Sequence, residues 1–267
     1  MRDLKELTVV GGYNKFNKKE NIKIVLNPGD IVSIVGENGS GKSQLLEDIQ
    51  CLAQGDTVTK RKILINSKEA LREERYSVDD KLVEVLKDKN DFLRDLTVED
   101  YILMRSTNAI YDNVNIIEDV IECANQLVGE RLKRKSELIK LSKGQVTALT
   151  IACVVFLSFS PILLIEELES KGIDKIKAIN LLLDEKKILI LSTKDLILSL
   201  IANKRIVVKD GGIEKIVKSN EKEKENLNFL FYLENQSTLL TEMIRKGESI
   251  NFNIKEDLIK SIGRVQS

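Results

Sequence analysis

The sequence predicts an α/β fold with a mostly parallel sheet, an antiparallel β segment at the N-terminus and a helical insert. Two short, fully apolar segments, residues 162–165 and 188–191, alternate with helical patterns, which is typical of parallel strands covered on both faces. Three β-like segments open the chain, and a charged stretch with helical spacing spans about residues 86–141. These observations favour one large α/β domain that contains a helical subdomain.

The composition excludes several classes of protein. The 267 residues are 42% hydrophobic, which is enough for a substantial core. Basic and acidic residues number 42 each, so the net charge is zero and gives no direct signal for a nucleic-acid partner. The lack of histidine excludes histidine-based triads and histidine zinc ligands. Cys51, Cys123 and Cys153 are too scattered for a CxxC metal site and odd in number for paired disulfides, which favours a reducing cytoplasm.

The first elements are expected to be three strands followed by a helix. The strands cover residues 7–10, 22–26 and 31–35. Pro28 and Gly29 suit the tight turn before the third strand, because proline presets φ and glycine tolerates a positive φ. Residues 44–52 follow a polar, glycine-rich stretch and carry apolar side chains at helical spacing. This order predicts a strand, a loop and then a helix.

The later elements alternate helices with strands. We expect strands at residues 62–66, 162–165 and 188–191. One helix is expected at residues 144–157, and another follows the strand at 162–165 and ends near residue 183. A hairpin is expected at residues 206–209 and 213–217. The last helix covers about residues 220–246, and its apolar face either packs on its own domain or binds a partner. The sequence therefore predicts a first domain over residues 1–218, with the helical subdomain at about 86–141, and a C-terminal helical extension over residues 219–267.

The strongest motif, GENGSGKS, follows the third strand and begins the next helix, as the GxxxxGK[ST] pattern requires. Its glycines let successive backbone N–H groups point at a phosphate, and the helix N-terminus adds about half a positive charge. Lys42 is expected to span the β- and γ-phosphates, and Ser43 to bind Mg²⁺. The motif predicts the phosphate loop of a P-loop NTPase, with a nucleoside triphosphate site formed by Gly36, Glu37, Asn38, Gly39, Ser40, Gly41, Lys42, Ser43 and Gln44.

A guanine nucleotide is disfavoured at this site. GTPases read the base with an [NT]KxD motif, and the best match, residues 193–196, has the sequence TKDL and lacks the aspartate at its fourth position. ATP is therefore the expected nucleotide.

Two further motifs follow in order along the chain. Residues 141–145, LSKGQ, begin a helix, and residues 162–167, ILLIEE, form an apolar strand that ends in two carboxylates. An apolar strand delivers its terminal side chains to the rim of a parallel sheet, where ligands bind. Together with the phosphate loop, these motifs resemble those of the ATP-binding cassette (ABC) family, whose signature is LSGGQ, over about residues 5–217.

The resemblance implies roles for individual residues. Glu166 would hold Mg²⁺ through water together with Ser43, and Glu167 would orient and polarise the attacking water. Tyr13 is placed to stack on adenine, with Phe16 as a rival.

Other residues are implied to face a second chain. The signature would contact the ATP of that partner chain through Ser142, Lys143, Gly144 and Gln145. Asp174 would lie in the family's D-loop, which corresponds to residues 170–174.

Several positions depart from the family pattern. Lys194 stands where the family has a histidine beside the γ-phosphate; it can donate to that phosphate or pair with the catalytic carboxylate, but it cannot accept a hydrogen bond. We therefore expect slow hydrolysis with Lys194 as a catalytic residue. Glu166 replaces an aspartate, and Lys143 replaces a glycine. Residues 87–88 (Lys-Asp) occupy the place of the Q-loop glutamine.

The implied function is an ATP hydrolase in which Mg-ATP joins two cassettes, as a homodimer or a heterodimer, and hydrolysis separates them. Three interpretations stay open. The chain is the ATP-binding subunit of an ABC transporter beside a membrane permease; or a soluble ABC ATPase acting on a cytosolic client in cofactor assembly, enzyme reactivation or translation; or a weakly hydrolytic ATP sensor or scaffold. No membrane span is expected, because serine and proline interrupt the apolar run at residues 149–165. The expected location is the cytoplasm, including the inner face of a membrane.

Overall fold

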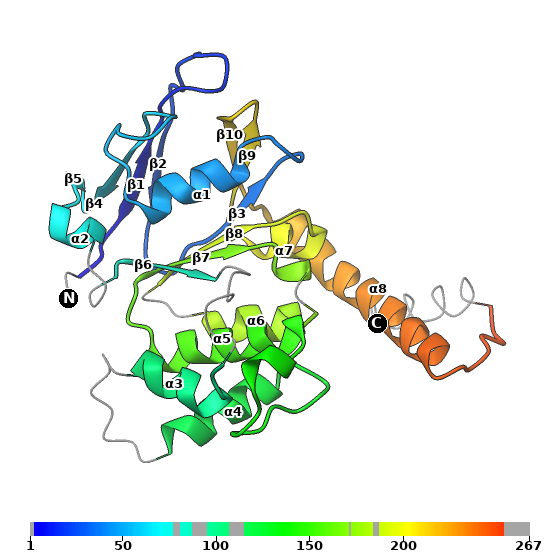
Figure 1. The fold of residues 1–267 in the computed structure, drawn as a ribbon. Coiled ribbons are helices and arrows are strands. Elements are labelled where there is room, and N and C mark those ends of the chain that lie inside the picture. Colours follow the sequence, from blue (N-terminus) through cyan, green and yellow to red (C-terminus); the bar gives the residue numbers. More distant parts are fainter. Residues whose placement is uncertain are drawn as a thin grey trace. The chain divides into compact units, whose positions relative to one another are not determined.

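The computed structural model describes residues 3–76, 81–86, 95–106, 115–170, 172–183 and 187–253. The chain divides into two units, Met1–Ser219 and Asn220–Ser267. The larger unit contains two β-sheets with the helices that cover them, and the smaller unit contains one long helix. Figure 1 shows the mixed α/β architecture of the larger unit, which confirms the predicted fold class.

The N-terminal part forms a four-stranded antiparallel sheet in the order β2-β1-β4-β5. Its strands are β1 (Leu7–Val10), β2 (Lys23–Leu26), β4 (Lys62–Ile65) and β5 (Lys68–Glu69). Along β2, buried and exposed residues alternate, as expected where one face of a sheet is covered. The antiparallel segment predicted from the sequence is therefore present.

The second sheet has six strands in the order β10-β9-β3-β8-β7-β6. Its strands are β3 (Ile31–Val35), β6 (Val83–Leu86), β7 (Ile162–Glu166), β8 (Ile188–Ser192), β9 (Lys204–Lys209) and β10 (Gly212–Lys218). All neighbours pair in parallel except β9 and β10, which form the predicted hairpin. Burial along the whole of β8 and nearly all of β7 explains why both strands are continuously apolar.

Alternate side chains of the central strands enter two separate cores. Ile162 and Leu164 pack with α1 (Lys42–Gln50) and the antiparallel sheet, whereas Leu163 and Ile165 pack with helices on the opposite face. Those helices are α3 (Val98–Ser106), α4 (Ile116–Asn125), α5 (Lys143–Leu157) and α6 (Lys175–Leu182). α1 thus lies between the two sheets (Figure 1), and its N-terminus is held against the end of β3.

The predicted helical segment begins later than its sequence pattern indicates. Leu86 ends strand β6 instead of starting a helix, because β6 pairs in parallel with β7 and this distant pairing overrides the local pattern. The pattern also gave no indication of α2 (Arg72–Tyr76), of α7 (Leu196–Ile201) or of the 3-10 turns Leu138–Lys140 and Leu168–Ser170. Residues 87–88, at the Q-loop position, lie outside the described residues.

The smaller unit contains α8 (Glu221–Arg245), within one residue of the predicted bounds at each end. Its first turn is capped by Asn220, whose side-chain oxygen accepts a hydrogen bond from the backbone N–H of Glu223 at 3.0 Å. Within the part of the chain that the structure describes, no helix combines the length and the apolar character needed to cross a membrane.

Candidate nucleotide-binding site

The candidate site lies where three neighbouring parallel strands end. In the register of the sheet, Ile34 pairs with Ser192, and Ser192 pairs with Glu166. The phosphate loop therefore leaves β3 beside the ends of β7 and β8. Residues far apart in the sequence meet at this edge because the carboxyl ends of parallel strands share one side of a sheet.

The turn from the phosphate loop into α1 requires glycine at position 41. Gly41 is the N-cap of α1 and adopts a left-handed backbone with φ of 104°. A Cβ atom there would lie 2.7 Å from the Cα of Gly211, in the β9–β10 turn. The backbone N–H of Gly211 also donates to the carbonyl oxygen of Ser40 at 2.7 Å. The hairpin turn therefore packs directly against the loop that begins α1.

Lys42 is buried and folded back over the phosphate loop. Its Nζ donates to the carbonyl oxygens of Gly36 at 2.8 Å and of Glu37 at 2.9 Å. Burial lowers the pKa of the Lys42 ammonium and the charge of Lys194 lowers it further, although nearby carboxylates oppose the shift. Lys42 thus ties the loop together and presents positive charge at the site.

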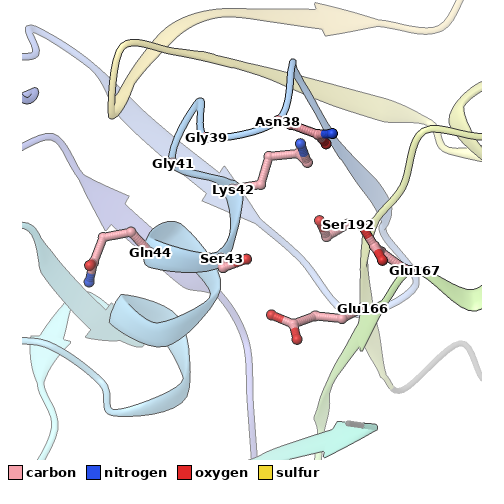
Figure 2. A pocket seen from close by; sticks show the side chains of 9 residues that line it. All are labelled: Asn38, Gly39, Gly41, Lys42, Ser43, Gln44, Glu166, Glu167 and Ser192. Atoms are coloured by element: carbon pink, nitrogen blue, oxygen red, sulfur yellow. The ribbon is translucent and has the colours of Figure 1, made fainter. Parts of the chain in front are cut away.

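A cavity of about 420 Å³ opens between the phosphate loop and the ends of β7 and β8. The residues that line it are Asn38, Gly39, Gly41, Lys42, Ser43, Gln44, Glu166, Glu167 and Ser192. Figure 2 shows Ser43, Ser192 and Glu166 gathered on one side of α1, with Gln44 on the other side of the helix. Six of the nine residues predicted for the phosphate loop line this cavity. The other three are Gly36 and Glu37, whose carbonyls hold Lys42, and Ser40, whose carbonyl holds Gly211.

The oxygen atoms in the cavity suit Mg²⁺. The Ser43 hydroxyl and the Glu166 carboxylate line the same space, and Mg²⁺ prefers oxygen ligands. Among the described residues, no group of three or more acidic, cysteine or histidine side chains could hold a metal by itself. A magnesium ion here would therefore share its ligands between one or two protein oxygens and the phosphates of a bound nucleotide, as is common for Mg²⁺.

Glu167 lines the cavity and is held in an unusual backbone conformation. Its φ is 47°, a left-handed geometry that costs a non-glycine residue about 1–3 kcal/mol. Its backbone N–H donates to the carbonyl oxygen of Ser192 at 2.9 Å. The Nζ of Lys194 donates to the Oε1 of Glu167, also at 2.9 Å. This is the pairing that the sequence allowed for Lys194.

Glu169 is a part of this arrangement that the sequence analysis missed. Its Oε1 accepts the backbone N–H of Lys194 at 2.8 Å, and its Oε2 accepts the hydroxyl of Thr193 at 2.9 Å. Both oxygens therefore hold the loop that carries Lys194. No sequence signal could have identified this role, because it depends on how the segment after β7 lies beside the segment after β8.

The signature residues lie at the N-terminus of α5 and do not line the cavity. The Ser142 hydroxyl accepts the backbone N–H of Gln145 at 3.2 Å, and the Gln145 side chain accepts the backbone N–H of Ser142 at 2.8 Å. This is a capping box. Gln145 is buried and also donates to the carbonyl of Glu130 at 3.2 Å. Its side chain thus braces Ser142, while contact of the signature, including Lys143 and Gly144, with a partner's nucleotide stays a prediction.

Asp174 and Tyr13 also lie outside the cavity lining. Asp174 caps α6, where its Oδ1 accepts the backbone N–H of Lys177 at 3.0 Å. The ammonium of Lys60 lies 5.7 Å from the centre of the Tyr13 ring; residue Tyr13 is 38% exposed, whereas residue Phe16 is 68% exposed. The choice between these two rings as the adenine-stacking group stays open.

Comparisons with known proteins show the family of the chain. The family model described as ABC transporter matches residues 19–168. An uncharacterized ABC transporter ATP-binding protein of Methanocaldococcus jannaschii is 41% identical over 249 residues, which cover 93% of this chain and 95% of that protein. The energy-coupling factor transporter ATP-binding protein EcfA1 of Streptococcus pyogenes is 27% identical over 79% of this chain and 77% of its own length.

Solved structures show the same fold. The dimeric structure of an ATP-binding cassette in a post-hydrolysis state, bound to ADP and Pi, superposes with a TM-score of 0.58 at 20% identity. The match covers 81% of this chain and 98% of that one. With a family model over more than half of its length and a relative at 41% identity over most of it, the chain belongs to the ATP-binding cassette family, as a nucleotide-binding domain.

Proposed function

We propose that this chain binds Mg-ATP between two cassettes and uses ATP hydrolysis to change the conformation of a partner, most simply the permease of an ABC transporter. The observation that carries this proposal is that Lys42, Ser43, Glu166 and Glu167 line the same cavity at the end of the parallel strands. The names of the relatives, which are ATP-binding proteins of transporters, support the choice of a permease.

The phosphates would bind at the N-terminus of α1. Backbone N–H groups and the helix dipole attract the negative charge, and Lys42 would exchange the carbonyls of Gly36 and Glu37 for phosphate oxygens. Ser43 and Glu166 would hold Mg²⁺ on the side of the cavity that they share. Bound Mg²⁺ would neutralise charge that develops on the phosphate oxygens.

Glu167 would orient the attacking water and accept its proton. Its left-handed backbone, its place in the cavity lining and its ion pair with Lys194 support this role. Lys194 can bridge this carboxylate and a γ-phosphate because an ammonium has three donors. Glu169 keeps the Lys194 loop in place.

The second cassette would complete the site. Ser142 caps α5, and Lys143 and Gly144 begin it, so the N–H groups of Lys143 and Gly144 and the helix dipole could bind the γ-phosphate held by a partner, while Gln145 braces Ser142. Asp174 would lie at the same interface. The partner cassette is a second copy or a related chain. Loss of the γ-phosphate removes the charge that joins the two halves, so hydrolysis opens the dimer.

Two measurements test the function. Purified chain supplied with Mg-ATP should release phosphate, and Glu167→Gln should strongly reduce the release. A tagged chain expressed in its own cells should co-purify with a membrane permease. Phosphate release without any membrane association would support a soluble ABC ATPase with a cytosolic client instead. ATP binding without phosphate release in any assembly would support a sensor or scaffold.

Ser142→Asp should separate ATP binding from dimer formation. Aspartate caps a helix as well as serine does, so α5 should stay intact, but its carboxylate would repel a partner's γ-phosphate. We expect unchanged ATP affinity in fluorescence titrations and loss of ATP-dependent dimers in light scattering. If the Ser142→Asp chain still dimerises with ATP, the signature is not part of the dimer interface.

Lys194→Met should slow hydrolysis by about 10- to 100-fold, the range expected for losing a charged hydrogen bond. The substitution keeps the aliphatic stem but removes the donor to Glu167. Lys194→Arg is the matched control and should retain most of the rate, because it keeps the charge. Steady-state phosphate release at saturating ATP makes the comparison, and a wild-type rate in Lys194→Met would exclude Lys194 from the reaction.

A further inference from the structure

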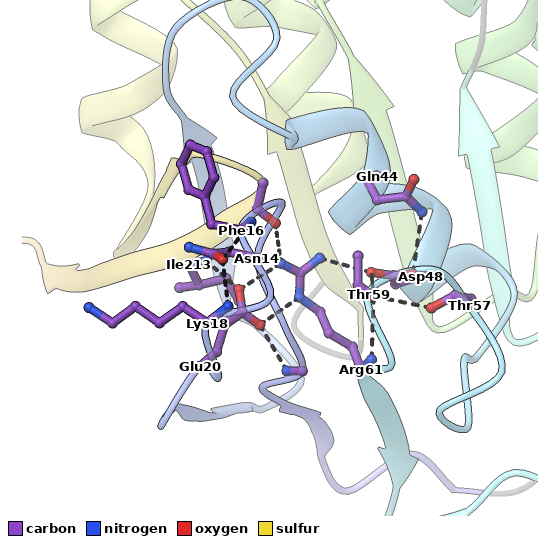
Figure 3. A network of polar contacts seen from close by, with 12 residues as sticks. Asn14, Phe16, Lys18, Glu20, Gln44, Asp48, Thr57, Thr59, Arg61 and Ile213 are labelled. Carbon is purple, nitrogen blue, oxygen red and sulfur yellow. Dashed lines mark hydrogen bonds and ion pairs between the residues drawn. The ribbon is translucent and has the colours of Figure 1, made fainter.

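A fully buried guanidinium, Arg61, lies just before β4 and holds two buried carboxylates. The side chains of Arg61 and Asp48 are 0% exposed and that of Glu20 is 3% exposed. Figure 3 shows these three residues at the centre of a network of polar contacts. Arg61 donates to Glu20 through Nε at 2.9 Å and Nη2 at 2.7 Å, and to Asp48 through Nη1 at 2.9 Å. The network carries one positive and two negative charges inside the protein.

The contact with Asp48 attaches Arg61 to the helix that carries the phosphate-binding residues. Asp48 lies in α1, six residues after Lys42, which corresponds to about 9 Å along the helix axis. The same oxygen of Asp48, Oδ2, also accepts the hydroxyl of Thr59 at 2.8 Å. α1 is therefore fixed both in rotation and along its axis at a point beyond its first turn.

A second contact attaches Arg61 to the phosphate loop. Its Nη2 donates to the carbonyl oxygen of Gly211 at 2.8 Å. Gly211 in turn donates its N–H to the carbonyl oxygen of Ser40 and packs its Cα against Gly41. One guanidinium thus reaches the loop before Lys42 through the hairpin turn, and the helix after Lys42 through Asp48.

Glu20 extends the network to the loop that carries Tyr13. Its Oε2 accepts the backbone N–H of Gly12 at 2.9 Å, and its Oε1 accepts the backbone N–H of Ile213 at 2.6 Å. Burial raises the pKa of the Glu20 carboxyl, but the hydrogen bonds from Arg61 and these N–H groups outweigh burial and hold that pKa below its ordinary value. Glu20 is therefore charged across the physiological pH range.

Burial of these charges does not by itself favour the folded state, since replacing a buried ion pair with well-packed apolar residues is often neutral or stabilising. What the network supplies is geometry, because its hydrogen bonds tie the loop, the helix and the hairpin turn to one planar group. We propose that Arg61 is a positioning residue that sets the phosphate loop relative to α1, so that Lys42 and Ser43 meet the phosphates together. This inference rests on the nucleotide binding proposed above.

The test compares Arg61→Lys with Arg105→Lys. Arg105 also pairs with a shielded carboxylate, Glu84, at 2.7 Å, but it lies outside the cavity and the network. Lysine keeps the charge in both variants but cannot reproduce the forked contacts. The probes are fluorescent ADP and ATP analogues, titrated well below the unfolding temperature of each variant. We expect Arg61→Lys to weaken the binding of both nucleotides about tenfold or more, as for one misplaced charged hydrogen bond. Arg105→Lys should bind them as the wild type does.

A purely structural role gives a different result. In that case Arg61→Lys and Arg105→Lys would both lower the melting temperature and leave the dissociation constants unchanged, which would overturn the inference while the proposed function stands. A wild-type chain that binds neither analogue would overturn both. If Arg61→Lys does not fold, Glu20→Gln provides the second variant, because it keeps the shape and removes one charge of the network. Glu20→Gln should also weaken nucleotide binding, and unchanged binding in that variant would contradict the inference.

Discussion

Replacing Glu167 with glutamine is expected to reduce ATP hydrolysis by about 10²- to 10⁴-fold, the contribution typical of a positioned general base. The amide has the size of the carboxylate but cannot accept the proton of the attacking water. Because Glu167 lines the cavity but is not one of the phosphate-binding groups, ATP should bind as tightly as before or more tightly. Phosphate release in single turnover and ATP titration measure the two effects separately.

Glu47→Gln is the matched control for this experiment. Glu47 is an exposed carboxylate on α1 that does not line the cavity, so its loss should leave the rate unchanged. A Glu167→Gln chain that releases phosphate at the wild-type rate would show that another group activates the water. Glu169 is the first alternative in that case, since it lies beside Lys194.

Replacing Lys42 with methionine is expected to weaken ATP binding by about 10- to 100-fold, because a charged hydrogen bond to the phosphates is lost. The same change removes the contacts with the carbonyls of Gly36 and Glu37, so the loop loses its own brace. Because Lys42 would exchange those carbonyls for phosphate oxygens on binding, the lost phosphate contacts decide the sign, and binding is expected to weaken. Isothermal titration of Mg-ATP measures the change.

Lys140→Met serves as the control for Lys42→Met. Lys140 is an exposed lysine paired with Glu137 at 2.8 Å, in a short turn of the helical part. Its replacement should change ATP affinity by less than the error of the titration. An unchanged dissociation constant in Lys42→Met would show that the phosphate loop does not bind the nucleotide, and it would contradict the proposed function.

The parts of the fold that could be predicted are those with local signals. The apolar strands at residues 162–165 and 188–191 are buried on both faces, so their composition alone indicates a parallel sheet. The phosphate loop is equally local, because its glycines and Lys42 act within eight consecutive residues. These local signals predict the edge of the sheet where the site lies and most of the residues that line the cavity.

The parts that could not be predicted depend on contacts between distant segments. Val83–Leu86 is a strand because it pairs with β7, whereas the sequence pattern predicts no strand there and places the start of a helical segment at about Leu86. The role of Glu169 depends on the segment after β7 lying beside Thr193 and Lys194, which no local pattern indicates. Arg61 is the clearest case, since its partners at positions 20, 48 and 211 are scattered over most of the larger unit.

The most direct test of the account is the mass of Glu167→Gln in solution, measured by multi-angle light scattering with and without Mg-ATP. The proposed mechanism holds ATP between the phosphate loop of one chain and the N-terminus of α5 in the other. It therefore predicts a monomer without nucleotide and a dimer with Mg-ATP, and no dimer once Ser142→Asp is added. A monomer under both conditions, in a chain shown to bind ATP, would contradict the homodimeric site.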